Sequence, residues 1–248
     1  MWSMFFQWFP YTQSGSTMFP MKKVAIFDID GTVFRSSLLI ELVENLIEKK
    51  IFPASSRKTY EQSFFAWQNR DGSYEAYIDD VIEVFRENIK GVSYKDFIET
   101  SREIVERKKH HVYRYTRDLI NELKKEGYYL LAISQSPKGI LDEFCKELGF
   151  DKVYGRFYEL GSNDCFTGEV TDMHLIENKS NIVRRAVEKE GLSLEDSYGV
   201  GDTEGDIPLL EQVTHPVCFN PNQALFRVAK INNWKVVVER KDVVYNIQ

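Results

Sequence analysis

The stretch KVAIFDIDGT, residues 23–32, determines more about the fold of this chain than any other. Its apolar, β-favouring run predicts a buried strand that stops abruptly at Asp28 and Asp30, followed at once by Gly31 and Thr32. In an open α/β sheet, ligands bind at the carboxyl ends of the strands. Two carboxylates there are costly unless a cation or a reacting group neutralises them, so the stretch indicates a functional site. The alternative is a strand that ends in an ordinary Asp/Gly turn.

A second segment, DSYGVGDTEGD (residues 196–206), repeats this pattern. A short apolar run again breaks into acids, Asp202 and Asp206, with Gly205 between them to relax the backbone. The apolar spacing that follows predicts a helix that starts near Asp206. Two strand ends that both present carboxylates favour Mg²⁺, which is usually held by carboxylates together with substrate phosphate and water.

Two further candidates lie between these acidic segments. Residues 128–136, YYLLAISQS, predict a strand that ends in the hydroxyl of Ser134, which can donate to a phosphate oxygen. Lys179 stands in the first turn of a predicted amphipathic helix over 178–190, where a cation is unfavourable unless an anion compensates it. Judged alone, Ser134 is better explained as a turn serine, and Lys179 is explained equally well as a solvated surface lysine.

Taken in order, the four segments resemble the motifs of the haloacid dehalogenase superfamily of phosphohydrolases. The matches are DIDGT at 28–32, Ser134, Lys179 and GDTEGD at 201–206. The stretch CFTGEVTDMH at 165–174 is similar to a short β-hairpin of the phosphoserine-phosphatase-like branch, subfamily IB. The resemblance implies an α/β fold with a Rossmann-like parallel sheet, helices on both faces and an inserted α-helical cap.

The strand and helix patterns agree with that fold and place its boundaries. Alternating strands and helices predict an α/β core formed by 21–35 and 113–248. Residues 36–112 show helical periodicity with charges throughout, which predicts an inserted module of four helices, two of them starting after the N-caps Ser73 and Ser93. The resemblance implies that this module is a helical cap over the active site. A stripe of four cap residues is either cap core or a substrate surface. These are Tyr60, Phe64, Trp67 and Arg70.

The chemistry of phosphate esters suggests roles for the acidic residues. An anionic nucleophile is repelled by a phosphate ester, so a divalent cation must lie between them. We expect Asp28 to attack phosphorus and form an aspartyl phosphate, and Asp30 to act as general acid and then as general base. Mg²⁺ would be held by Asp28, Asp202 and, as the resemblance implies, the backbone carbonyl of Asp30. Asp206 would act from a second shell by holding metal-bound water or orienting its neighbours.

Three further residues are expected to surround the transferring phosphoryl group: Thr32, Ser134 and Lys179. Positioning and charge stabilisation dominate this class of reaction, and Lys179 would be the main fixed positive charge. The chain departs from phosphoserine phosphatase where that enzyme carries a glutamate for the substrate amine, because Ser37 stands there. Gln135-Ser136 and Gly205 are further departures. The residues for phosphoryl transfer are therefore present, whereas those for amino-acid recognition are not.

These observations predict a Mg²⁺-dependent phosphomonoester hydrolase that acts on a small phosphorylated metabolite. A phosphotransferase that passes the phosphoryl group to an alcohol would use the same residues. A phosphate-ligand sensor without turnover is a third interpretation, although such a protein is expected to lack one of the key acids or the lysine. The sequence leaves the substrate and the oligomeric state open.

Composition limits the possible partners. A net charge of −6 argues against nucleic-acid binding through a basic surface. No stretch is apolar enough to span a membrane. The aromatic-rich extension at 1–20 is expected to be a loosely attached tail, or else an anchor that touches a membrane surface or a partner. Three scattered cysteines fit a reducing compartment, so a cytoplasmic protein is expected.

Overall fold

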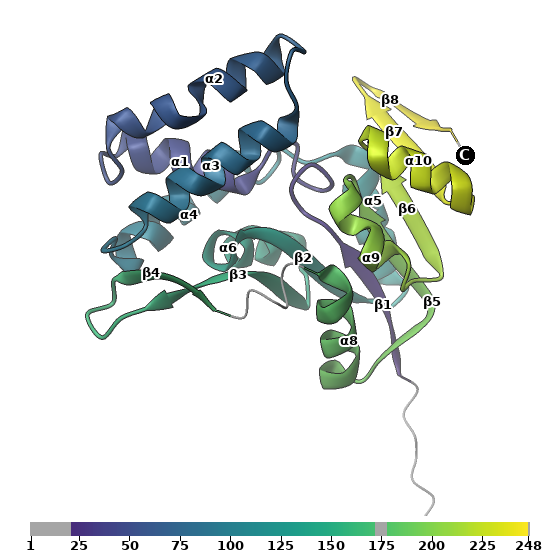
Figure 1. The fold of residues 1–248 in the computed structure, drawn as a ribbon. Coiled ribbons are helices and arrows are strands. Elements are labelled where there is room, and N and C mark those ends of the chain that lie inside the picture. Colours follow the sequence, from purple (N-terminus) through teal and green to yellow (C-terminus); the bar gives the residue numbers. More distant parts are fainter. Residues whose placement is uncertain (1–20, 172–177, 248) are drawn as a thin grey trace, which may run out of the picture.

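The computed structural model describes residues 21–171 and 178–247. In this part of the chain, eight strands form one sheet in the order β4-β3-β2-β1-β5-β6-β7-β8 (Figure 1). The six inner strands pair in parallel, and the two edge strands pair antiparallel to their neighbours. The strands are β1 (Lys22–Phe27), β2 (Tyr129–Pro137), β3 (Lys152–Leu160), β4 (Phe166–Thr171), β5 (Leu192–Gly201), β6 (His215–Phe219), β7 (Lys235–Arg240) and β8 (Val243–Asn246).

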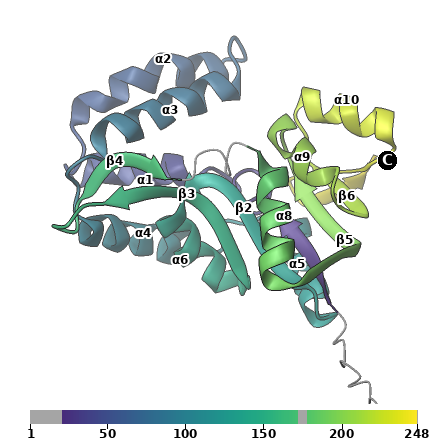
Figure 2. The same cartoon turned by 60° about the horizontal axis from the view of Figure 1, so that its bottom comes forward.

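Helices cover both faces of this sheet because successive residues of a strand point to opposite sides. Val24 and Ile26 of β1 belong to an apolar cluster with α8, α9 and α10, whereas Ala25 and Phe27 belong to a second cluster with α5 and α6. Figure 2 shows how these helices are arranged around the sheet. The predicted fold class is therefore confirmed. These helices are α5 (Arg114–Lys125), α6 (Lys138–Leu148), α8 (Lys179–Glu190), α9 (Ile207–Leu210) and α10 (Gln223–Asn232), and the short 3-10 turn η2 (Glu204–Asp206) precedes α9.

The remaining helices lie between β1 and α5 and form what we call the helical module. They are α1 (Leu38–Glu48), α2 (Arg57–Gln68), α3 (Tyr74–Asn88) and α4 (Tyr94–Lys108), with the 3-10 turn η1 (Ala54–Ser56) before α2. The N-caps predicted for α3 and α4 are confirmed, because the hydroxyls of Ser73 and Ser93 each accept from a backbone N–H at 3.1 Å. The division of the chain into cap and core domains at 36 and 112 remains a prediction.

The aromatic stripe of α2 lies inside the helical module. Tyr60 is buried, and Phe64 and Trp67 pack against Tyr77 of α3 with ring centroids 5.2 and 5.6 Å from it. Arg70 stands in the turn after α2 with a positive φ of 66°. The three aromatic residues of the stripe therefore belong to the packing of the module, which is the first of the two interpretations, whereas Arg70 is exposed.

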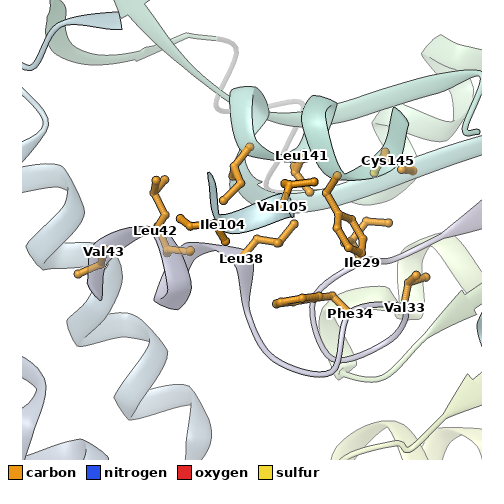
Figure 3. Packing of buried hydrophobic residues seen from close by; sticks show 14 of the residues in the cluster. Ile29, Val33, Phe34, Leu38, Leu42, Val43, Ile104, Val105, Leu141 and Cys145 are labelled. Carbon is orange, nitrogen blue, oxygen red and sulfur yellow. The ribbon is translucent and has the colours of Figure 1, made fainter. Parts of the chain in front are cut away.

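One continuous apolar cluster joins the module to the sheet. Ile29 and Phe34 from the loop after β1 lie in the same cluster as Leu38 of α1, Ile104 of α4 and Leu141 of α6 (Figure 3). All five side chains are fully buried. The loop that carries Asp28 and Asp30 is thus anchored in the core on both sides.

Several predicted boundaries differ from the structure. β2 runs on to Pro137, past Ser134, because its pairing with β3 shifts register between Ile133 and Pro137 and then resumes. The helix predicted to start near Asp206 is only the four residues of α9, preceded by η2. Residues 166–171 pair with β3 as β4, while 172–174 of the predicted hairpin, and the extension 1–20, lie outside the described residues.

No helix within 21–171 and 178–247 has the length and apolarity that a membrane span requires.

Candidate active site

The carboxyl ends of β1, β2 and β5 meet at one edge of the sheet, and the predicted acids gather there. The backbone N–H of Asp28 donates to the carbonyl of Val200 at 2.9 Å, which fixes the end of β1 against β5. Gly31 takes a φ of +83°, and a Cβ at this position would lie 2.2 Å from Oδ2 of Asp202. Only glycine therefore allows the turn to bring the two acidic loops into contact.

Lys179 connects the acids of both loops. Its Nζ lies 2.6 Å from Oδ1 of Asp28 and 2.5 Å from Oδ1 of Asp206, and all three side chains are buried. Oδ2 of Asp206 accepts from the backbone N–H groups of Asp202 and Thr203 at 2.9 and 3.0 Å. Asp206 thus holds both the lysine and the loop that carries Asp202.

Burial sets the electrostatics of this cluster. Burial raises the pKa of Asp28 to about 7, although the neighbouring Lys179 opposes the shift. Burial and the charges of Asp28 and Asp206 hold the pKa of Asp202 well above its ordinary range. Burial alone would lower the pKa of Lys179, but its two carboxylate partners outweigh burial and raise it. The lysine is a fixed cation, while the carboxylates have more negative charge than one lysine can balance.

Asp30 is held apart from that cluster by three donors. Its Oδ2 accepts from the hydroxyls of Ser134 at 2.5 Å and Ser136 at 2.8 Å, and its Oδ1 accepts from the backbone N–H of Leu38 at 2.6 Å. Burial nevertheless raises the pKa of Asp30, with the two serines and Leu38 opposing it. The sequence analysis named Ser136 only as a departure from phosphoserine phosphatase and not as a site residue. A second hydroxyl two residues after Ser134 was the only signal for its role.

Thr32 lies in the turn that follows Asp28 and Asp30, with its side chain fully buried. Its hydroxyl donates to Oδ1 of Asp202 at 3.2 Å. Among the predicted site residues, Thr32 and Asp206 do not line the cavity described below, whereas Asp28, Ser134 and Lys179 do.

A cavity of about 250 Å³ lies between this edge of the sheet and the helical module. Besides the residues already described, its lining includes side chains that the sequence analysis did not assign to the site. These are Ser37, Leu39, Tyr74, Ile78, Asp79, Ile82, Gln135 and Thr203. Burial raises the pKa of Tyr74, and so do the charges of Asp30 and Asp202, so this tyrosine of α3 lies within electrostatic reach of the acids. No sequence signal distinguished it from other helix aromatics.

The acidic cluster also fits a hard divalent cation. One carboxylate oxygen from each of Asp28, Asp202 and Asp206 can be chosen so that all three lie within 4.8 Å of one another. Oxygen donors at this spacing, with an excess of buried negative charge, suit Mg²⁺. Because both oxygens of Asp206 already accept hydrogen bonds, Asp28 and Asp202 are the better direct ligands.

The mostly parallel α/β sheet, with carboxylates, a serine and a lysine at its carboxyl edge, defines the class of the protein as an α/β protein with a candidate active site at that edge. A sequence model of the haloacid dehalogenase-like hydrolases matches residues 25–211 of the chain. The chain therefore belongs to this family, which confirms the predicted family and the prediction of an enzyme.

Similar proteins support this assignment. A histidinol-phosphatase of Neisseria meningitidis is 28% identical over 224 residues, covering 88% of this chain and 99% of the relative. A Bordetella pertussis protein of unknown function matches in structure with a TM-score of 0.67 and 18% identity, over 87% of this chain and 98% of the other. A phospho-aspartyl intermediate analogue of phosphoserine phosphatase matches with a TM-score of 0.57 and 20% identity, over 90% and 95%. The two structural matches show the fold.

Proposed function

We propose that this protein is a Mg²⁺-dependent phosphomonoester hydrolase that acts on a small phosphorylated metabolite through an aspartyl phosphate on Asp28. The observation that carries the proposal is the buried contact of 2.6 Å between Asp28 and Lys179 at the floor of the cavity. It gives a carboxylate nucleophile a fixed positive charge beside it, as attack on an anionic ester requires. The phosphatase relative and the family match support the same reaction class.

In this mechanism, Asp28 attacks phosphorus and the ester oxygen leaves as an alcohol. Asp30 supplies the proton for that oxygen and then accepts a proton from the water that hydrolyses the aspartyl phosphate. Its raised pKa suits the first role because it favours the protonated acid. Without substrate, the hydroxyls of Ser134 and Ser136 both donate to the carboxyl of Asp30. With substrate bound, the hydroxyl of Ser134, which lines the cavity, would donate to a phosphate oxygen instead, and Ser136 would keep Asp30 in place.

The metal site would consist of Asp28, Asp202 and the backbone carbonyl of Asp30, with Asp206 behind them. When bound, Mg²⁺ would neutralise charge between the nucleophile and the phosphate. Lys179 would stabilise the charge of the transferring phosphoryl group, and Thr32 would support phosphate binding by keeping Asp202 in place through its hydroxyl. A phosphotransferase would share all of these parts and differ only in the acceptor.

We also infer a cytoplasmic location, because Cys145, Cys165 and Cys218 are all free thiols in the structure.

The proposed function is tested with p-nitrophenyl phosphate and two variants of the nucleophile loop. The parent protein should hydrolyse this ester with Mg²⁺ and lose activity with a chelator. Asp28→Asn should lower kcat by at least about 10³, because the covalent route is lost. Asp30→Asn should still form a phosphoenzyme from this good leaving group, stable to acid quenching and cleaved by hydroxylamine as an aspartyl phosphate is, and should then release phosphate slowly. Undiminished turnover by Asp28→Asn would contradict the proposal, and transfer to an added alcohol would identify the phosphotransferase.

A further inference from the structure

The helical module shapes the half of the cavity that faces the acids. Leu39 of α1 and three residues of α3, Tyr74, Ile78 and Ile82, give this half a largely apolar wall. Asp79, on the same face of α3, adds a carboxylate at the exposed rim. A leaving group in this half of the cavity would contact apolar side chains along its length, and the end farthest from the phosphate would lie near the carboxylate of Asp79.

Asp79 forms no ion pair with any residue that the structure describes. In the described part of the chain, no lysine, arginine or histidine nitrogen lies within 4.0 Å of its carboxylate. The adjoining hollow, which Asp79 also lines, adds Glu83, Arg86 and Glu87, so its charge is negative on balance. An unpaired carboxylate beside further acids attracts cations.

The cavity offers little to a second anion. Among its described lining residues, the one lysine or arginine is Lys179, whose Nζ is already shared by Asp28 and Asp206. Arg156 donates to Gln135 at 2.7 Å but lines a neighbouring hollow between α6 and β4. A carboxylate on the leaving group would therefore lie near the negative charge of Asp79, and no lysine or arginine of the described lining would be free to pair with it.

We propose that the substrate is a phosphorylated amino alcohol: a phosphate ester whose leaving group has an apolar body and ends in a protonated amine, without a carboxylate. The inference rests on the proposed function and narrows it. The phosphoryl group lies at Asp28 and Lys179, the carbon skeleton lies along Tyr74 and Ile78 of α3, and the ammonium group pairs with Asp79.

A pair of nearly isosteric substrates tests this directly. Aminopentyl phosphate and hexyl phosphate differ in an ammonium group against a methyl group at the chain end. The parent enzyme should prefer the amine by about fivefold in kcat/KM, the size expected for one partly exposed charge pair at the upper end of its range. Asp79→Asn should bring this ratio close to one. Asp80→Asn removes the same charge from the next residue, which does not line the cavity, and should keep the preference.

Each other outcome is decisive. Equal kcat/KM for the two esters in the parent, or an unchanged preference in Asp79→Asn, overturns the inference. Faster hydrolysis of phosphoserine than of aminopentyl phosphate overturns it too, because a carboxylate would then be accepted. If p-nitrophenyl phosphate is hydrolysed while the amine gives no advantage, this inference fails and the proposed function stands. If no ester is hydrolysed, the proposed function fails first and the inference with it.

Discussion

At the scale of single residues, the environment of Asp28, the proposed nucleophile, disfavours the charged form of its carboxyl. The ordinary pKa of its carboxyl is 3.8, and burial raises it to about 7 despite the contact with Lys179. Because the folded pKa lies above the unfolded one, the contribution of this group to stability is fully present below pH 4 and is lost as the pH rises to about 7. The metal-free site therefore lowers the stability of the fold at neutral pH, and a bound cation would relieve this.

This predicts that Asp28→Asn stabilises the metal-free protein at high pH. With a chelator at pH 8, the variant should exceed the parent in free energy of unfolding by on the order of 2 kcal/mol, and the difference should shrink towards zero below pH 4. Mg²⁺ should raise the Tm of the parent more than that of the variant. Thermal and urea unfolding at several pH values measure both effects. The exposed substitution Glu61→Gln is the control, and a variant no more stable than the parent at pH 8 would contradict the account.

At the scale of elements, α3 is the helix of the module that contributes the most side chains to the lining of the cavity. Its buried face, which includes Tyr77, Val81 and Phe85, packs in the module, while Tyr74 and Ile78 line the cavity. Its N-terminus is held by the hydroxyl of Ser73, one residue before Tyr74. The start of α3 should therefore affect substrate binding as well as stability.

The matched N-caps of α3 and α4 allow these effects to be separated. Ser73→Ala and Ser93→Ala each remove one hydrogen bond of 3.1 Å and should each lower the free energy of unfolding by about 0.5–2 kcal/mol. Ser73→Ala should also raise KM by a few-fold, because Tyr74 loses its fixed position, whereas α4 does not line the cavity. Urea unfolding and steady-state kinetics on one ester measure both. Equal changes of KM in the two variants would show that α3 has no special role.

The helices were predictable because their signals are local. Apolar spacing and the caps Ser73 and Ser93 act within a few residues, so they can be seen in one segment. The extent of β2 was not predictable in this way, since its continuation past Ser134 depends on how it pairs with β3. The short α9 likewise had a helical pattern longer than the helix that forms.

The residues of the candidate site also fall into those that a local signal predicts and those that only tertiary packing brings to the site. Asp28, Asp202 and Lys179 could be predicted because charged residues at the ends of apolar strands and at a helix N-terminus are anomalous in the sequence. Tyr74 and Asp79 could not, because an aromatic and an acid on a charged helix are ordinary. Only the packing of the module against the sheet brings them to the cavity.

At the scale of the whole molecule, the helical module and the sheet share one apolar cluster. The cluster extends from Phe27 and Ala132 in the sheet, through Phe34, to Leu42 and Phe85 in the module. A module that shares its core with the sheet cannot expose that surface without losing burial on both sides. The two parts should therefore unfold together.

Two tryptophans can report on this cooperativity from opposite parts of the fold. Trp67 packs in the module, and Trp234 packs in the cluster beneath α8 and α10. Variants in which only one of them remains, with Trp2 and Trp8 also replaced by phenylalanine, should show fluorescence transitions in urea that coincide with each other and with far-UV circular dichroism. Phe34→Ala should shift both transitions to lower urea together, because it opens a cavity where the two parts meet. The free energy of unfolding should fall by about 3–5 kcal/mol. An earlier transition at Trp67 alone would mean that the module unfolds as a separate unit.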